Sequence, residues 1–237
     1  MIRTIYWFIA FWLYQLFSLI AKLRYWFYGK RGNEEKQQKV LCKTTTKWAK
    51  LMIRLTGSKI SVAGVENIPD RNVLFVSNHQ GNFDIPILMG YVPKLKGFVA
   101  KVELENLPIV SGWMKKLGCL FLDRQNPRQS LKVILKGISY LKEGNTLVIF
   151  PEGTRSKSST IGEFKKGSLK LATKSGVPIV PVTINGSYKI LEEKKRIRKS
   201  NVNITVHPPI YMDDMTKEDE NKLIDRVYEI IKSGLDN

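Results

Sequence analysis

Residues 73–90 read VLFVSNHQGNFDIPILMG and contain both of the patterns that recur along the chain. The run Val73–Ser77 is short, apolar and rich in β-branched and aromatic residues, which predicts a buried strand. Asp84 then precedes Ile85 and Pro86, a sequence typical of a helix start, because aspartate caps free amides and proline fits the first turn. A strand, a polar loop and a helix in this order indicate an α/β fold.

The same alternation continues on both sides of this stretch. Short apolar runs bounded by turn residues predict seven strands, at Ile60–Val65, Val73–Ser77, Gly97–Ala100, Cys119–Leu122, Thr146–Phe150, Ile179–Ile184 and Asn203–His207. Amphipathic segments predict helices at Ile85–Gly90, Ile109–Leu117, Pro127–Lys142, Lys165–Ser175 and Lys217–Ser233. Strands that alternate with helices predict a mostly central, mixed β-sheet flanked by helices on its faces.

The N-terminal part of the chain follows a different pattern. Ile5–Ala21 is 17 residues of almost unbroken apolar sequence, which is at the short end for crossing a bilayer. Glu34–Thr56 is basic and amphipathic, as expected of a helix on a membrane surface. We therefore expect a two-helix membrane-association motif over residues 1–56, lying in one leaflet, before an α/β domain over residues 57–237. The alternative is a single transmembrane anchor followed by a soluble helix, and length alone does not decide between them.

Charge and composition indicate which partners and which kinds of site the chain is expected to have. The chain has 39 Lys and Arg against 21 Asp and Glu, a net charge of +18 that attracts nucleic acid or an anionic membrane. No zinc-finger, helix-turn-helix or RNA-recognition signature is present, and the apolar N-terminus favours the membrane over nucleic acid. Two cysteines indicate no disulfide framework, and two histidines show no zinc spacing, so no metal site is expected.

The loop after Val73–Ser77 carries the first residues with catalytic potential. His79 is followed by four residues and then Asp84, an HX4D motif. If the loop brings the Asp84 carboxylate to one imidazole nitrogen, the other nitrogen is free to take a proton from a hydroxyl. Taken alone, this spacing also fits a surface histidine and an ordinary helix-capping aspartate.

Three further motifs follow along the chain. They are Gly118–Arg124 (GCLFLDR), Phe150–Ser156 (FPEGTRS) and Val180–Val182 (VPV), each in or after an apolar run. In this order, and with the HX4D loop, they resemble the glycerolipid acyltransferase family, specifically the bacterial 1-acylglycerol-3-phosphate acyltransferases. The resemblance covers residues 60–207.

The resemblance implies a role for each matching residue. His79 corresponds to the catalytic base and Asp84 to its partner. The implied ligands of the substrate phosphate are Lys101, Arg124 and Arg155, where guanidinium groups offer paired donors. The implied contacts to substrate or oxyanion are Glu152, Gly153 and Thr154. The family has a second lysine after the one matched by Lys101, and Val102 stands in its place.

The implied reaction transfers a fatty acyl group from a thioester to the sn-2 hydroxyl of 1-acylglycerol 3-phosphate (lysophosphatidic acid). The product is phosphatidic acid, in phospholipid biosynthesis, by a His–Asp general-base mechanism without a covalent intermediate. No bound cofactor or metal is implied, because acyl-CoA or acyl carrier protein serves as co-substrate. The implied partner is the phospholipid bilayer, at the cytoplasmic face of the inner membrane, and no nucleic acid.

Alternatives remain at the level of residues and of function. Asp123 and Arg124 also fit a surface ion pair, and Lys101 one more cation of a basic surface. The basic run 189–200, KILEEKKRIRKS, fits a solvated turn or helix, or a contact with anionic lipid. The rival functions are acylation of another acceptor, such as glycerol 3-phosphate, and non-catalytic binding of lipid or nucleic acid.

Overall fold

The computed structural model describes residues 1–213 and 215–235, except the side chain of Lys166. Seven strands of this part form one sheet in the order β1-β7-β6-β2-β5-β3-β4. Neighbouring strands are parallel except β6 and β7, which are antiparallel, so the sheet is mixed, as the sequence predicts. The strands are β1 (Lys59–Ala63), β2 (Leu74–Ser77), β3 (Gly97–Lys101), β4 (Leu120–Leu122), β5 (Leu147–Ile149), β6 (Ile179–Asn185) and β7 (Asn201–Val206).

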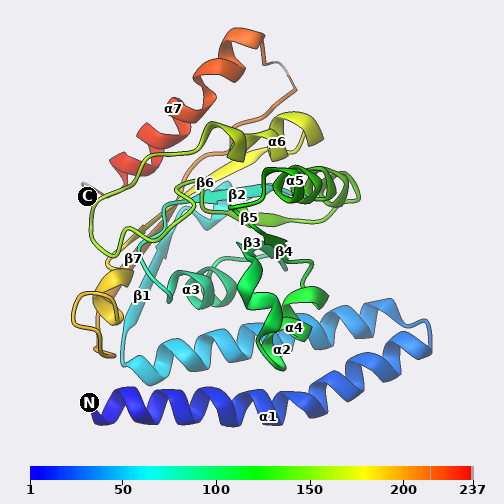
Figure 1. Ribbon diagram of the computed structural model, residues 1–237, viewed down its shortest axis with the longest axis vertical. Helices are drawn as coiled ribbons and strands as arrows, with labels where there is room; N and C mark the ends of the chain where they lie inside the picture. The colour runs from blue at the N-terminus through cyan, green and yellow to red at the C-terminus, as the bar shows by residue number, and fades with distance from the viewer. Residues whose placement is uncertain (214, 236–237) are drawn as a thin grey trace.

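Helices cover both faces of this sheet (Figure 1). They are α1 (Ile2–Lys30), α2 (Glu34–Thr56), α3 (Asp84–Tyr91), α4 (Val110–Lys116), α5 (Pro127–Lys142), α6 (Lys170–Ser175) and α7 (Lys217–Ser233). Alternate residues of β2 point to opposite sides, because side chains along a strand have a period of two. Phe75 packs in the core with α2 and α3, whereas Leu74 and Val76 pack in the core with α5, α6 and α7.

All predicted strands and helices are present, with local differences at their ends. The first strand ends before Val65, which lies in a 3₁₀ turn, η1 (Val65–Asn67). Gly64 makes this turn with φ 77°, and a Cβ there would lie 2.0 Å from the Val206 carbonyl oxygen. The segment predicted as one helix at Lys165–Ser175 divides into a 3₁₀ turn, η3 (Lys166–Leu169), and α6. The sequence therefore indicates the elements well and their boundaries less well.

The N-terminal segment forms the expected hairpin of two helices. Trp7 Nε1 of α1 donates to the Met52 carbonyl of α2 at 2.9 Å, and the Tyr14 hydroxyl donates to the Thr44 carbonyl at 3.0 Å. Met52 and Ile53 are fully buried in the same core cluster as Phe75 of the sheet. The hairpin is thus packed into the core, and a domain boundary at residue 57 stays a prediction.

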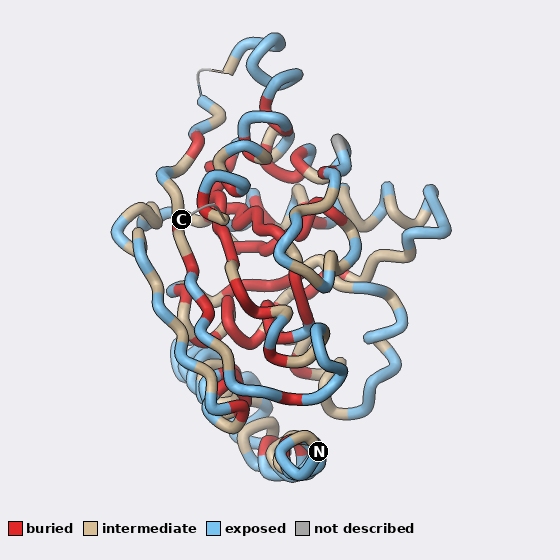
Figure 2. The backbone as a smooth tube through the Cα atoms, turned by 90° about the vertical axis from the view of Figure 1, so that its left-hand side faces the viewer, coloured by how far each residue is buried: buried red, intermediate tan, exposed pale blue. Residues whose placement is uncertain are grey.

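Helix α1 leaves a long apolar face exposed. By length and composition it is the one helix of the described chain that could cross a membrane, and only 11% of its most apolar window is buried. Figure 2 shows buried residues concentrated in the sheet, with mostly exposed and intermediate ones along the N-terminal helices. The outward residues follow helical spacing: Ile5, Ile9, Leu13, Leu16, Ile20, Leu23 and Phe27.

A buried lysine binds the free carbonyl groups at the C-terminal end of α3. Lys96 is 3% exposed, and its Nζ donates to the carbonyl oxygens of Val92 at 2.7 Å and Leu88 at 3.2 Å. These carbonyls lie at the helix C-terminus, where intrahelical donors run out. Burial lowers the pKa of Lys96 from its usual value to about 7. The folded protein therefore releases a proton near neutral pH that the unfolded chain retains up to about pH 10.4.

This difference predicts a pH-dependent stability. Between about pH 7 and pH 9 the unfolded chain binds more protons at this lysine, so the free energy of unfolding rises with pH by up to about 1.4 kcal/mol per unit. The Lys96→Met variant lacks this contribution, whereas Lys132→Met, at an exposed position of α5, keeps it. Guanidinium unfolding at several pH values measures both slopes, and equal slopes for wild type and Lys96→Met would contradict the assignment.

Candidate active site

The loop between β2 and α3 is held in place by two buried amides. Asn78 is fully buried, donates to the Ile184 carbonyl at 2.9 Å and accepts from the Ile184 amide at 2.8 Å. Gln80 is also fully buried, and its Oε1 accepts from the amides of Gly186 at 2.9 Å and Ser187 at 3.2 Å. Both residues therefore attach the loop to the end of β6, and they fix the backbone on either side of His79.

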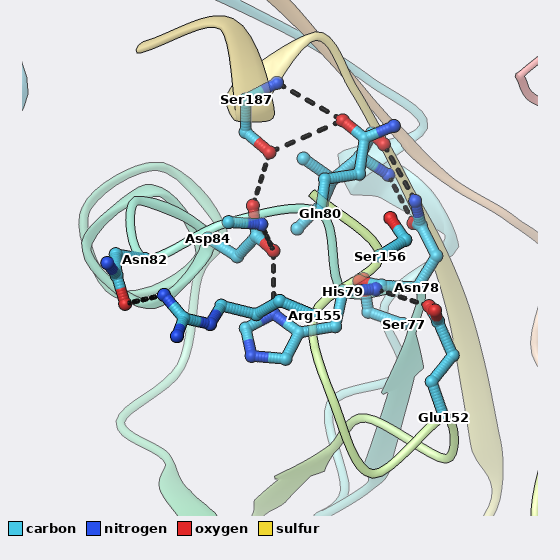
Figure 3. A network of polar contacts seen from close by, with 12 residues as sticks. Ser77, Asn78, His79, Gln80, Asn82, Asp84, Glu152, Arg155, Ser156 and Ser187 are labelled. Atoms are coloured by element: carbon cyan, nitrogen blue, oxygen red, sulfur yellow. Dashed lines mark hydrogen bonds and ion pairs between the residues drawn. The ribbon is translucent and has the colours of Figure 1, made fainter. Parts of the chain in front are cut away.

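His79 and Asp84 meet as the spacing predicts (Figure 3). Nδ1 of His79 lies 2.7 Å from Oδ2 of Asp84, which also accepts from the Gly81 amide at 2.8 Å. Oδ1 of Asp84 accepts a short hydrogen bond from the Ser187 hydroxyl. The imidazole stacks on Phe150, with ring centroids 4.1 Å apart. Asp84 is fully buried while the His79 side chain is 16% exposed, so the free Nε2 is the nitrogen available to a substrate.

Asp84 differs from the expected capping residue in one respect. It is the first residue of α3, and no side chain caps the start of this helix. The Asp84 carboxylate instead accepts hydrogen bonds from the Gly81 amide of the loop and from the Ser187 hydroxyl. Ser187 was not identified from the sequence. It lies 103 positions away, in a 3₁₀ turn, η4 (Ser187–Ile190), and the only local signal is a Gly-Ser pair after an apolar strand.

Glu152 supports the loop from the turn that follows the neighbouring strand β5. It is 5% exposed, and it accepts from the His79 amide at 2.6 Å and the Gly162 amide at 2.9 Å. Burial raises the pKa of the Glu152 carboxyl, and the two amide donors oppose that rise. Both carboxylate oxygens are therefore engaged with backbone amides. This geometry favours a positioning role over the expected contact with substrate.

The neighbouring residues of this motif divide between turn and cavity. The Gly153 amide donates to the Phe150 carbonyl at 3.0 Å and Gly153 has φ 71°, so this residue shapes a turn, and the contact with substrate or oxyanion implied for it stays a prediction. Thr154 and Arg155 line a cavity that also includes His79. The amides of Ser156 and Lys157 donate to the carbonyls of His79 and Gln80, which joins the two motifs directly.

A cavity of about 520 Å³ opens at His79. Lys101, Arg124 and Arg155, the three cations predicted to bind phosphate, all lie on its lining. Most of the remaining wall is apolar and comes from α3, β3 and the 102–117 segment, including Met89, Phe98, Leu104, Leu107, Trp113 and Met114. The hairpin closes it with residues that include Tyr14, Gln15, Ser18 and Trp48. The site thus combines a base, positive charge and an apolar pocket.

The three cations have different surroundings. Arg155 Nη1 donates to Asn82 Oδ1 at 2.5 Å and lies 3.4 Å from Glu192 Oε1. Lys101 Nζ lies 2.5 Å from Glu103 Oε1 at an exposed position. Partial burial lowers the pKa of Arg124, against the opposing charge of Glu103.

The basic run 189–200 forms a turn whose six Lys and Arg side chains are exposed, as the sequence indicates, but Glu192 within it is buried. Its side chain is 5% exposed, and Oε1 accepts from the Asn82 amide at 2.8 Å. Burial raises the pKa of its carboxyl. Ile190 and Ile197 of the same run are also buried, so the segment is anchored to the site and to the core.

Other titratable side chains lie elsewhere. His207 Nε2 is 2.8 Å from the Thr183 hydroxyl at the end of β7, outside the cavity lining, and burial lowers its pKa. Over the described residues, no group of three or more His, Cys, Asp or Glu side chains is arranged to hold a metal ion.

Known proteins are similar to this chain in sequence and in fold. Residues 59–185 match the model of the family described as Acyltransferase. A probable 1-acyl-sn-glycerol-3-phosphate acyltransferase of Mycoplasma pneumoniae is 41% identical over 64% of this chain and 59% of its own length. The chloroplast 1-acyl-sn-glycerol-3-phosphate acyltransferase LPAT1 of Arabidopsis thaliana is 36% identical over 65% of this chain and 44% of its own length. The match therefore spans about half the length of these curated relatives.

A solved structure extends the comparison to nearly the whole chain. The crystal structure of PlsC, the 1-acyl-sn-glycerophosphate acyltransferase of Thermotoga maritima, has a TM-score of 0.88 and 32% identity to this chain. The alignment covers 99% of this chain and 94% of that one, so it includes the N-terminal hairpin as well as the sheet. The family model covers more than half of the chain and includes the HX4D loop and the FPEGTRS motif. This chain belongs to the acyltransferase family.

Proposed function

We propose that this protein transfers a fatty acyl group from a thioester to the sn-2 hydroxyl of 1-acylglycerol 3-phosphate, giving phosphatidic acid. The observation that carries the proposal is the His79–Asp84 pair at the mouth of a cavity that has both cations and a long apolar wall. A lysophosphatidic acid molecule needs this combination, since it has a phosphate, a free hydroxyl and an acyl chain. The names of the curated relatives point to the same acceptor.

The mechanism follows from the contacts of His79. Asp84 holds Nδ1 in its protonated form, so Nε2 accepts the proton of the acceptor hydroxyl as that oxygen attacks the thioester carbonyl. The tetrahedral intermediate collapses, the carbon–sulfur bond breaks, and the imidazolium returns its proton to the leaving thiolate. The products are an ester and a thiol. The hydroxyl of the substrate is the nucleophile, so no acyl-enzyme intermediate is required.

The positions of three cations support the proposed binding of the acceptor phosphate. Arg155 is oriented by Asn82, which lies in the same β2–α3 loop as His79. Its fork of donors matches a phosphate, and Arg124 and Lys101 add charge on the same cavity lining. The thioester donor is acyl-CoA or acyl carrier protein, and both are anionic, so the +18 charge favours either encounter.

The exposed face of α1 supports a location at the phospholipid bilayer. A contiguous apolar face of this length is expected to be covered by lipid or by another protein. Because acceptor and product are both lipids, we propose that α1 and α2 hold the enzyme on the cytoplasmic face of the inner membrane. Non-catalytic binding, the rival function, does not explain the buried carboxylate paired with His79.

The first prediction concerns the catalytic pair. His79→Ala removes the base and is expected to abolish acyl transfer, and Asp84→Asn is expected to lower turnover by about 10³–10⁴-fold, because the amide favours the wrong tautomer. The measurement is phosphatidic acid formed from lysophosphatidic acid and a thioester in detergent micelles, with glycerol 3-phosphate as a second acceptor. A folded His79→Ala variant with wild-type turnover would exclude the mechanism. Acyl transfer to glycerol 3-phosphate but not to lysophosphatidic acid would show that glycerol 3-phosphate is the acceptor.

The second prediction concerns the phosphate. Arg155→Ala is expected to raise KM for lysophosphatidic acid by about 10–100-fold, since a charged hydrogen bond contributes about 1.5–3 kcal/mol. KM for the thioester should change little. Lys157→Ala removes the same charge from an exposed position two residues away and serves as the matched control. A change confined to the thioester KM would show that Arg155 binds the donor instead.

The third prediction concerns the membrane. Leu16 and Ile20 are 57% and 56% exposed on the outer face of α1, so the double variant Leu16→Glu/Ile20→Glu should lose most of its binding to lipid vesicles. The control, Ser139→Glu/Ser159→Glu, adds the same charge at exposed positions of the α/β domain and should bind as wild type does. Vesicle flotation compares them, with circular dichroism to verify folding. Equal flotation of both variants would exclude α1 as the membrane contact.

A further inference from the structure

A second cavity lies away from His79, at the start of α1. It has a volume of about 660 Å³ and is lined by residues 1–3 and 196–199, none of which lines the cavity at His79. The basic run 189–200 therefore has two contacts in the fold, with the active site near Glu192 and with the first turn of α1 near Ile197.

We propose that this second cavity binds the headgroup of an anionic phospholipid of the bilayer. The proposal rests on the membrane association proposed above and specifies where and how one class of lipid is recognised. The first argument is charge. Four of the residues that line the cavity are cations, Arg3, Arg196, Arg198 and Lys199, and none is acidic. Over the described residues, no ion pair involves any of the four.

The second argument is that the backbone of the cavity is fixed. Ile197 is 4% exposed in the core, and its amide donates to the Thr4 hydroxyl of α1 at 2.9 Å. The Arg198 amide donates to the carbonyl of Ile190, itself fully buried, at 2.9 Å. With Ile197 pointing inward, Arg196 and Arg198 on either side of it are exposed. The backbone that carries these cations is thus fixed before any ligand arrives, which lowers the entropic cost of binding.

The third argument is the position of the cavity beside apolar surface. Met1 and Ile2 line it together with the cations, and Ile2 is 86% exposed. Ile2 and Ile5 begin the outward apolar face of α1, and Figure 1 places this end of the helix at the foot of the molecule, below β1. A phospholipid satisfies both surfaces, because its phosphate meets the guanidinium groups while its acyl chains lie along the helix. A free phosphate or a nucleic acid would leave the apolar part uncovered.

The test compares vesicles of phosphatidylcholine alone with vesicles that contain one part phosphatidylglycerol to two parts phosphatidylcholine. The wild-type chain should bind the anionic vesicles more tightly. The triple variant Arg196→Gln/Arg198→Gln/Lys199→Gln should lose that preference, by about fivefold for each cation removed. The matched control, Lys132→Gln/Lys136→Gln/Lys142→Gln, removes the same charge from exposed positions of α5 and should retain the preference.

Each outcome decides one question. Equal losses in the triple variant and in the α5 control would overturn the site and assign the preference to the net charge, and an unchanged triple variant would overturn it outright. Failure of the wild type to bind either vesicle would instead overturn the proposed membrane association. Displacement from anionic vesicles by inorganic phosphate, at an ionic strength matched with chloride, would show a free-phosphate site and not a lipid site. Turnover of the triple variant in neutral detergent micelles should equal that of wild type, which confirms its fold.

Discussion

A carboxylate with no access to water, that of Asp84, is the constraint on which the site depends. A buried carboxylate is costly unless donors surround it. Three donors meet it, the Gly81 amide, the Ser187 hydroxyl and Nδ1 of His79. The first comes from the β2–α3 loop and the second from the far end of β6. The hydrogen bonds of this one side chain therefore connect the loop, the end of β6 and the imidazole, and they orient His79.

Much of this could be predicted from sequence because it depends on local patterns. The run before Asn78 has strand character, the loop has a helix start after it, and four residues separate the base from its partner, so the His79–Asp84 contact follows from local geometry. The distant side chains that hold the loop could not be found in this way. Ser187 and Glu192 act on the loop from more than 100 positions away, and neither residue type is distinctive in its local sequence. The burial of Lys96 could not be predicted for the same reason, since nothing near it in sequence marks it as the residue that binds the C-terminal carbonyls of α3.

The family resemblance identified the important motifs but not the division of labour inside them. Glu152, Gly153 and Arg155 lie close together in one motif, yet their roles differ. The Glu152 carboxylate accepts from backbone amides, Gly153 makes a turn, and Arg155 lines the cavity. A turn requires this separation, because successive side chains point in different directions and Gly153 has a positive φ. Motif membership alone therefore does not distinguish a ligand of the substrate from a residue that positions the base.

Helix α1 of the hairpin lines the cavity at His79 with one side and exposes its opposite side at the molecular surface. Tyr14, Gln15 and Ser18 of α1 line the cavity at His79, and Trp113 Nε1 donates to the Ser18 hydroxyl at 2.9 Å, which fixes α4 against the helix. Leu16 and Phe17, interleaved with them in sequence, are 57% and 69% exposed. An α-helix with its side chains is about 10–12 Å across, so the exposed apolar side of α1 and the apolar pocket are separated by only that distance. Under the proposed function, an acyl chain passes from the bilayer to the base around a single helix without crossing bulk water, and the same helix that holds the protein on the membrane also forms a wall of its active site.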